Sequence, residues 1–249
     1  MNKDVVVCIG TKGRPHTKTY KLFDGLFKVY HFIEPQDFDK YDVPNKINIE
    51  KNDKGIAYMR NFVLKWCKKN KHDWMILADD DIDRFGVSKG TKTIDKGAII
   101  WEEIYNKVKT LPYEQYGINY SQFAWSETKQ ISINCKFVDC CVLFRLDKLS
   151  WDFGDWKLKV DRNFTLETIK NGYGALRFNK YWLSCPKVGT NKGGLQELYE
   201  NKVDTIWAKK LVEKWKPFGK LFKKDGRIDA KIDIKAVAKH YDKVVYESH

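Results

Sequence analysis

Four aspartates, Asp79, Asp80, Asp81 and Asp83, directly follow the apolar segment 74–77. Carboxylates held this close repel one another, and a bound divalent cation relieves that repulsion. Their hard oxygen atoms suit Mg²⁺ or Mn²⁺ bridging to a diphosphate. Because side chains alternate along a strand, Asp79 and Asp81 can point to one side while Asp80 points to the other. We therefore predict Asp79 and Asp81 as metal ligands, and Asp79 and Asp80 as contacts of a bound cofactor. The simpler alternative is a solvated acidic loop.

The segment 54–61 is a second candidate, because it combines small residues with an arginine. Gly55 and Ala57 at the start of a helix permit a phosphate to approach backbone N–H groups closely. Arg60 lies one turn further on, where its guanidinium is suited to bidentate pairing with a diphosphate. A surface arginine on an amphipathic helix explains the same pattern, so Arg60 gains weight only in combination with the acidic cluster.

The elements that position these residues alternate between strands and helices. We expect a helix after Asn52 or Asp53, either of which is a suitable N-cap, with apolar residues on one face at helical spacing. Other expected helices cover about 98–109, 161–171 and the lysine-rich tail from 195 onward. Expected strands cover 5–9, 27–33, 48–50, 74–77, 116–123, 131–134, 138–144 and 176–183.

This alternation predicts an α/β fold with a mostly parallel sheet and helices on both faces. Ligands of such sheets bind beyond the carboxyl ends of the strands. Two polar clusters, 11–14 and 79–83, lie at such ends and should meet at one edge of the sheet. We expect a catalytic domain over 1–194 and a basic helical extension over 195–249 that packs on it.

Two further polar positions are weaker candidates. Glu34 follows the second expected strand, and its position suggests a contact with a nucleoside. The segment 188–194 is glycine-rich and basic, which is typical of a mobile lid whose Lys192 reaches a diphosphate. An ordinary surface loop explains that segment equally well.

The charge of the chain points to polyanions. A net charge of +13 over 249 residues attracts them without regard to their sequence. An aromatic share of 14% favours nucleic acid slightly, since flat rings stack on exposed bases. A generally basic, soluble surface is the alternative. The stretch 209–224 interleaves lysines with aromatic residues, and an amphipathic helix and a DNA-backbone contact explain it equally well.

Two observations bear on the compartment. No apolar run approaches the length of a membrane span, and the N-terminus lacks the layout of a signal peptide. We therefore expect no membrane partner and a cytoplasmic location. The six cysteines form no CxxC pair, which favours buried, reduced thiols over a zinc site.

The order and spacing of these motifs resemble those of the family-2-like GT-A glycosyltransferases. Residues 5–15 are similar to the family's opening strand and nucleoside-binding loop, although a glycine replaces the usual proline. Residues 55–61 resemble the Gly-x-x-x-x-Arg-Asn segment over the nucleotide-sugar, and 79–81 resemble the metal-binding DxD motif. The resemblance implies a GT-A (Rossmann-like) fold. It also implies a UDP-sugar donor, first of all UDP-glucose, bound with Mn²⁺ or Mg²⁺ and contacted by Thr11 and Arg14.

Residues 160–164, followed by a Gly-Tyr pair, resemble the family's Glu-Asp-x-Asp-Phe segment, with Val160 in place of the glutamate. The family's aspartate is the catalytic base, which implies this role for Asp161. An inverting transfer needs a base for the proton of the acceptor hydroxyl, and the N-terminus of a helix keeps a carboxylate ionised. Asp161 as a plain first-turn residue is the alternative, and Asp152 and Asp155 are rival bases.

Within this family, the basic, compact chain with its lysine-rich end most resembles the TET-associated DNA glycosyltransferases of phages. That resemblance implies transfer of a sugar to the hydroxyl of a 5-hydroxymethylpyrimidine, such as 5-hydroxymethylcytosine, in double-stranded DNA. Tyr120, Phe123 and Trp125 are then candidates for the aromatic walls that a flipped base requires. The alternatives are transfer to a saccharide, lipid carrier or other small acceptor, a catalytically inactive DNA-binding module, and a metal-dependent nuclease or phosphotransferase.

Overall fold

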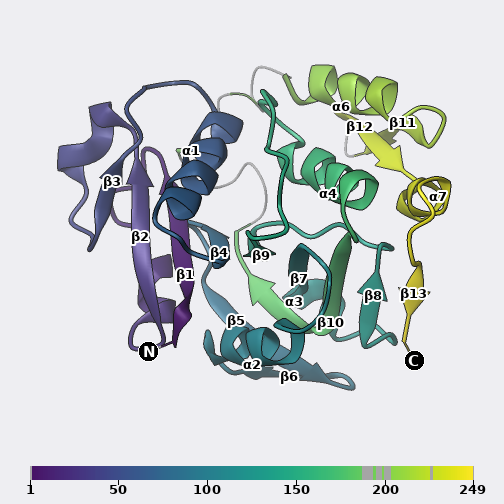
Figure 1. The fold of residues 1–249 in the computed structure, drawn as a ribbon, viewed down its shortest axis with the longest axis horizontal. Helices are drawn as coiled ribbons and strands as arrows, with labels where there is room; N and C mark the ends of the chain where they lie inside the picture. The colour runs from purple at the N-terminus through teal and green to yellow at the C-terminus, as the bar shows by residue number, and fades with distance from the viewer. Residues whose placement is uncertain (1, 187–192, 195–197, 199–202, 225–226, 249) are drawn as a thin grey trace.

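The alternating segments build one central β-sheet in the computed structural model, which describes residues 2–186, 193–194, 198, 203–224 and 227–248 (Figure 1). β9 (Cys141–Arg145) lies antiparallel between β4 (Trp74–Asp79) and β7 (Gln115–Tyr120). The other central strands run in one direction, so the sheet is mostly parallel, as predicted. The strands that share this direction are β3 (Lys46–Asn48), β2 (Phe27–Ile33), β1 (Asn2–Thr11), β4 (Trp74–Asp79), β7 (Gln115–Tyr120) and β10 (Ala175–Ser184).

Short antiparallel strands extend this sheet beyond β10. β8 (Ile131–Ile133) pairs with β10, and β13 (Tyr246–Glu247) pairs with β8. β5 (Arg84–Lys89) also pairs with β10 and forms a hairpin with β6 (Lys92–Asp95). β5, β6 and β13 were not predicted. β6 is exposed along its whole length, and β13 is too short to carry an alternating pattern.

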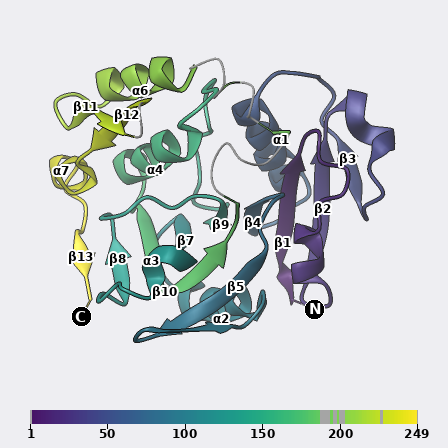
Figure 2. The same ribbon diagram turned by 180° about the vertical axis from the view of Figure 1, so that it is seen from behind.

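Helices cover both faces of the sheet, as Figure 2 shows from behind. α2 (Ile99–Val108) and the 3₁₀ helix η1 (Thr19–Phe23) pack with one hydrophobic cluster, in which Trp101 and Phe23 are fully buried. The opposite cluster takes its residues from α1 (Ile56–Lys69), α4 (Val160–Asn171), α6 (Val203–Lys214) and α7 (Ile234–His240). Among the helices of the described residues, none has the length and apolar character needed to cross a membrane.

The C-terminal segment differs from the expected helical tail. After α6 the chain forms a separate two-stranded sheet of β11 (Gly219–Lys224) and β12 (Arg227–Ile232), followed by α7 and β13. Trp207 and Trp215 are buried in the same hydrophobic cluster as the central strands, so these two aromatics belong to the core. The division at residue 194 remains a prediction.

Local boundaries also differ from expectation, among them β3, which covers Lys46–Asn48 and not 48–50. The N-cap of α1 is Gly55 and not Asn52 or Asp53, because Gly55 adopts a φ of 86° and the Asp53 side chain instead accepts a hydrogen bond from Lys12. β7 ends at Tyr120 and is followed by the short helix α3 (Ser121–Ala124). β9 begins at Cys141, after a residue with a positive φ that interrupts the strand.

Candidate active site

The two polar clusters that follow β1 and β4 meet at one edge of the sheet. These strands are parallel neighbours, with Gly10 opposite Asp79. The hydroxyl of Thr11 donates a hydrogen bond of 2.6 Å to Asp80. The guanidinium of Arg14 pairs with Asp80 and, at 3.1 Å, with Asp81. The predicted encounter of the clusters 11–14 and 79–83 is therefore confirmed.

The three consecutive aspartates differ in exposure, as strand alternation predicts. The Asp80 side chain is only 6% exposed and is held by the partners just described, whereas those of Asp79 and Asp81 are 36% and 23% exposed. Asp79 and Asp81 are therefore the two carboxylates of this run that a ligand can reach.

Arg60 joins this cluster to a distant part of the chain. It projects from α1 and is buried, which excludes the alternative of an exposed surface arginine. Its guanidinium donates hydrogen bonds to Asp161 and, at 3.4 Å, to Asp79. The same guanidinium lies 5.5 Å from the ring centroid of Phe153. Arg60 therefore fixes the acidic end of β4 and the first turn of α4 relative to each other.

Asp161 lies in the first turn of α4, as predicted, and its side chain is partly exposed. The rival candidates Asp152 and Asp155 are exposed, in the loop before α4. Asp152 accepts a hydrogen bond of 2.9 Å from the backbone N–H of Gly154, which is a local turn contact. Of these three carboxylates, Asp161 is the one paired with Arg60 among the described contacts.

The site carries more negative charge than its two arginines offset. Partial burial, together with the nearby carboxylates of Asp161, Asp81 and Asp80, raises the pKa of Asp79 to about 7, even though Arg60 opposes the shift. Burial also raises the pKa of Asp80 against the effect of Arg14. A divalent cation would relieve this repulsion.

The donor set near Asp79 fits a cation that also binds a ligand. Within the described ranges, no three His, Cys, Asp or Glu side chains are grouped so that they could hold a metal ion. Mg²⁺ usually takes one or two carboxylates and completes its shell with substrate phosphates and water. The two accessible carboxylates, Asp79 and Asp81, match that requirement.

The loop after β1 is anchored by residues that the sequence analysis missed. The backbone N–H of Gly13 donates to Asp37 at 3.2 Å, and that of Arg14 donates to the hydroxyl of Tyr41 at 2.7 Å. Asp37 belongs to the 3₁₀ helix η2 (Pro35–Lys40). In the sequence, the only indication of Asp37 and Tyr41 was that they follow Glu34 closely. Contacts between segments far apart in the chain leave no periodic pattern that would predict them.

Glu34 is buried beside the same loop. Its carboxylate accepts hydrogen bonds from Gln36 at 2.7 Å and from Lys12, whose ammonium lies 3.1 Å away. Lys12 also pairs with Asp53, just before the N-cap glycine of α1. Glu34 therefore lies beside the predicted nucleotide-binding loop, with Lys12 linking it to the start of α1.

Two glycine positions bear on the predicted phosphate contacts: Gly55, and residues 193–194 at the described end of the predicted lid. A Cβ on Gly55 would meet nothing within 4 Å, so its φ of 86°, and not lack of space, favours glycine there. Gly194 donates its backbone N–H to the carbonyl oxygen of Lys12 at 3.1 Å, so residues 193–194 lie against the loop. Lys192, the predicted lid contact, lies outside the described residues.

A second acidic position near the site was also missed by the sequence analysis. Burial and the neighbouring charge of Asp161 raise the pKa of Asp139, just before β9. The adjacent Cys140 accepts the backbone N–H of Asp79 on its carbonyl oxygen at 2.7 Å, and its thiol lies 2.9 Å from the hydroxyl of Tyr120. The only signal of this position in the sequence was that Asp139 is a single acidic residue between the apolar Val138 and Cys140.

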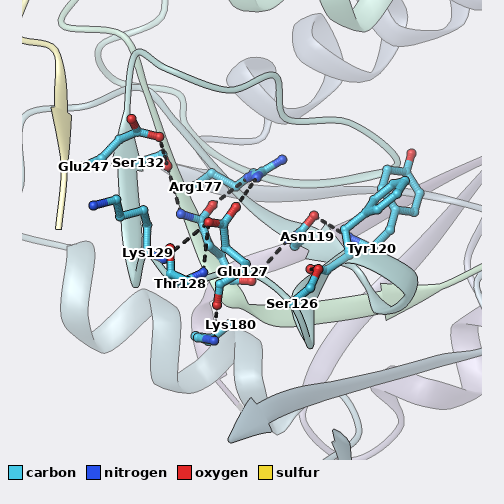
Figure 3. Close-up of polar contacts among 12 residues, drawn as sticks. Asn119, Tyr120, Ser126, Glu127, Thr128, Lys129, Ser132, Arg177, Lys180 and Glu247 are labelled. Atoms are coloured by element: carbon cyan, nitrogen blue, oxygen red, sulfur yellow. Dashed lines mark hydrogen bonds and ion pairs between the residues drawn. The ribbon is translucent and has the colours of Figure 1, made fainter. Parts of the chain in front are cut away.

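The predicted aromatic walls lie at the end of β7. Tyr120 is partly buried against Cys140, whereas Phe123 and Trp125 are exposed on and just after α3. The chain that follows α3 is tied to β10: Lys180 donates to the carbonyl oxygen of Glu127, as the dashed lines of Figure 3 show. The α3 segment is therefore held at both ends, with its aromatic side chains directed to solvent.

A family model matches the sequence of this chain, and solved structures match its fold. The sequence model of a family described as TET-Associated Glycosyltransferase matches residues 7–194. No curated protein sequence matches the chain.

Among solved structures, glucosyl-3-phosphoglycerate synthase from Mycobacterium tuberculosis, in complex with Mg²⁺ and UDP, is 11% identical over 92% of this chain and 86% of its own, with a TM-score of 0.55. The same enzyme with Mn²⁺, UDP and phosphoglyceric acid has 11% identity, the same coverage and a TM-score of 0.54. A197 from STIV is 8% identical over 74% of this chain and 85% of its own, with a TM-score of 0.45. At this identity, the match to the synthase shows a shared fold, the predicted GT-A type.

Proposed function

Because this chain belongs to the TET-associated glycosyltransferase family, we propose that it transfers a sugar from a UDP-sugar to the hydroxyl of a 5-hydroxymethylpyrimidine in double-stranded DNA. UDP-glucose is the first donor to test and 5-hydroxymethylcytosine the first acceptor base. The observation that carries this proposal is the buried Arg60, which pairs with both Asp79 and Asp161 and so places a carboxylate beside the acidic end of β4. On this proposal the reaction takes place in the cytoplasm, that of the host if the protein is phage-encoded.

The donor would bind between the loop after β1, the start of α1 and the end of β4. Thr11, Arg14 and Glu34 would contact its nucleotide, and the N-terminus of α1 at Gly55 would face its phosphates. Asp79 and Asp81 would hold Mn²⁺ or Mg²⁺, which when bound supplies Lewis-acid stabilisation of the leaving diphosphate. The synthase from Mycobacterium tuberculosis, which has the same fold, was solved with UDP and either ion, and this supports the assignment.

Asp161 would act as the base. Its carboxylate would accept the proton of the acceptor hydroxyl as the hydroxyl oxygen forms its bond to the anomeric carbon. The bond from that carbon to the diphosphate breaks on the opposite side, so the configuration inverts. Arg60 would hold Asp161 in place through the ion pair between its guanidinium and the Asp161 carboxylate.

The acceptor assignment depends on two observations. The family description connects the chain to TET enzymes, and the net charge of +13 favours a polyanion. The exposed ring of Phe123 lies beside Tyr120 and that of Trp125 lies at the end of α3, and both would stack on a displaced base.

One assay tests the whole proposal. The protein is incubated with Mn²⁺, a panel of UDP-sugars, and duplexes that contain or lack 5-hydroxymethylcytosine, and UDP release is measured. UDP release that depends on the modified base supports the proposal, whereas hydrolysis of every UDP-sugar without acceptor preference would refute it. DNA cleavage without any donor would indicate a nuclease, and transfer only to small acceptors would indicate a different GT-A activity.

Two variants test the residue roles. Asp81→Ala should abolish metal-dependent donor binding, and Asp161→Asn should preserve donor binding while reducing transfer on the order of 10²–10⁴-fold, the usual range for a general base. Asp152→Asn is the matched control, since it removes an exposed carboxylate from the preceding loop. If Asp161→Asn transfers normally, the base assignment is wrong.

A further inference from the structure

The β11–β12 pair, here called the ribbon, stands apart from the central sheet. Its two strands pair only with each other in the described part of the chain, and the ribbon lies beside α6, far from the β5–β6 hairpin at the opposite end of the molecule (Figures 1 and 2). Ala230 and Ile232 anchor it by packing into the hydrophobic cluster. A lone two-stranded hairpin is marginally stable, so this packing holds the ribbon in place.

The outer part of the ribbon combines positive charge with exposed apolar side chains. Leu221, Phe222 and Ile228 are 42%, 36% and 37% exposed, although large apolar residues gathered in one small element are usually buried or bound. The strand register places Phe222 on one face of the ribbon and Leu221 with Ile228 on the other. Exposed basic residues lie on both faces: Lys220, Arg227 and Lys231 on the face of Phe222, and Lys223 on the face of Leu221. Among the described residues, the three lysines of this set make no ion pair, so their charge is available to a partner.

The one acidic residue on the described part of the ribbon is already neutralised. Asp229 pairs with Lys159 at 2.7 Å and with Arg162 at 3.1 Å. These two partners outweigh its burial and lower the pKa of Asp229. Arg162 also donates to the carbonyl oxygen of Ala230 at 3.0 Å.

These contacts connect the ribbon to the candidate active site. Lys159 is the N-cap of α4, and Arg162 directly follows Asp161 in its first turn. A ligand held on the ribbon therefore lies next to the segment that carries the proposed base, and Arg60 continues the connection to Asp79.

We propose that the ribbon is the element that holds double-stranded DNA. This inference rests on the proposed function. Its strands are about 5 Å apart, and the DNA major groove, about 12 Å wide, admits a two-stranded ribbon. The lysines contact phosphates on either side of the groove, Lys220 and Lys231 from the face that carries Phe222 and Lys223 from the other face, while Phe222 contacts sugars and thymine methyl groups. The attachment through Asp229 places the bound duplex where a displaced base reaches Asp161.

The test removes the three ribbon lysines together, as Lys220→Gln, Lys223→Gln and Lys231→Gln. The matched control removes three exposed lysines from the β5–β6 hairpin and its end, as Lys89→Gln, Lys92→Gln and Lys96→Gln. Each triple variant loses the same charge from a hairpin. Binding to a 20-base-pair duplex is measured over a salt series, with UDP-glucose binding and transfer to free 5-hydroxymethyldeoxycytidine as further readouts.

At 0.1 M salt, the ribbon variant should bind the duplex more weakly by roughly 5- to 10-fold for each phosphate that it no longer neutralises, and its salt slope should fall by about 0.9 per phosphate. Donor binding and transfer to the free nucleoside should stay at the wild-type level, and the control should bind DNA as the wild type does. A ribbon variant with wild-type affinity and slope overturns this inference and leaves the proposed function standing.

Two other outcomes are equally decisive. A wild-type protein that transfers sugar to the free nucleoside but neither binds nor modifies duplex DNA refutes the DNA part of the proposed function, and the ribbon assignment with it. If the ribbon variant keeps its DNA affinity but loses binding to vesicles of phosphatidylserine and phosphatidylcholine, the ribbon is a membrane contact and the inference is wrong.

Discussion

Replacing Arg60 by glutamine gives the sharpest test of how the site is assembled. The change removes the guanidinium that pairs with both Asp79 and Asp161 and leaves these carboxylates facing each other without it. Breaking a buried ion pair costs about 3–5 kcal/mol. Because the Asp79 and Asp161 side chains are 36% and 32% exposed, solvent screens part of that loss. We expect a loss of about 2–3 kcal/mol in the free energy of unfolding.

For a chain of this size, that loss lowers the melting temperature by roughly 5–10 °C. The effect on transfer should be larger than the effect on folding, since a misplaced base costs on the order of 10²-fold in kcat. Thermal unfolding and UDP release at saturating donor measure the two effects. Arg60→Lys keeps the charge without the planar fork, so it should recover part of the stability and little of the kcat.

Arg84→Gln is the matched control, because Arg84 is exposed at the start of β5. It should change neither the melting temperature nor kcat. If Arg60→Gln folds and transfers at the wild-type rate, Asp161 needs no positioning by Arg60 and the account of the site is refuted. Equal kcat in Arg60→Lys and wild type would limit the role of Arg60 to its charge.

Three further predictions concern the ribbon, the start of α1 and the aromatic wall. Asp229→Asn should destabilise the protein at pH 7, because the lowered pKa of Asp229 gives a stabilisation that is complete above its unfolded value near 4 and is lost as the pH falls further. The gap in melting temperature between variant and wild type should therefore narrow at pH 3, and a constant gap would contradict this reasoning. Gly55→Ala and Gly25→Ala both put a side chain at positive φ and should each cost about 1 kcal/mol in unfolding experiments, but only Gly55→Ala should weaken UDP-glucose binding in calorimetry. The double change Phe123→Ala and Trp125→Ala should raise KM for modified duplex DNA by on the order of 10-fold or more, since stacking contributes about 1–3 kcal/mol per base. An unchanged KM for DNA would exclude these rings from the acceptor site.

The central elements were readable from the sequence because their patterns are local. The apolar runs at 5–9, 27–33 and 74–77 correspond to β1, β2 and β4, and the expected helix at 161–171 corresponds to α4. The rule that parallel strands present their carboxyl ends at one edge then placed Thr11 and Arg14 beside the aspartates. The order of the motifs also carried the family assignment.

The contacts that give these residues their environment were decided by the tertiary structure. Arg60 reads as a surface residue on an amphipathic helix, and only the tertiary structure buries it between Asp79 at the end of β4 and Asp161 in α4. Asp37 and Tyr41 gain their roles in the same way, by folding back onto the loop after β1. Residues that meet across a fold share no sequence period, so no local pattern predicts these pairs.

The lysine-rich end shows the same limit for secondary structure. Its composition determined a positive surface, but alternating lysines and apolar residues fit a helix and a strand alike over so short a stretch. Gly219 permits the close approach of Val212, and Ala230 and Ile232 find their place in the core, which selects the ribbon over a continued helix. The sequence by itself thus determined the chemistry that each segment carries, and packing between distant segments determined which of those groups act together.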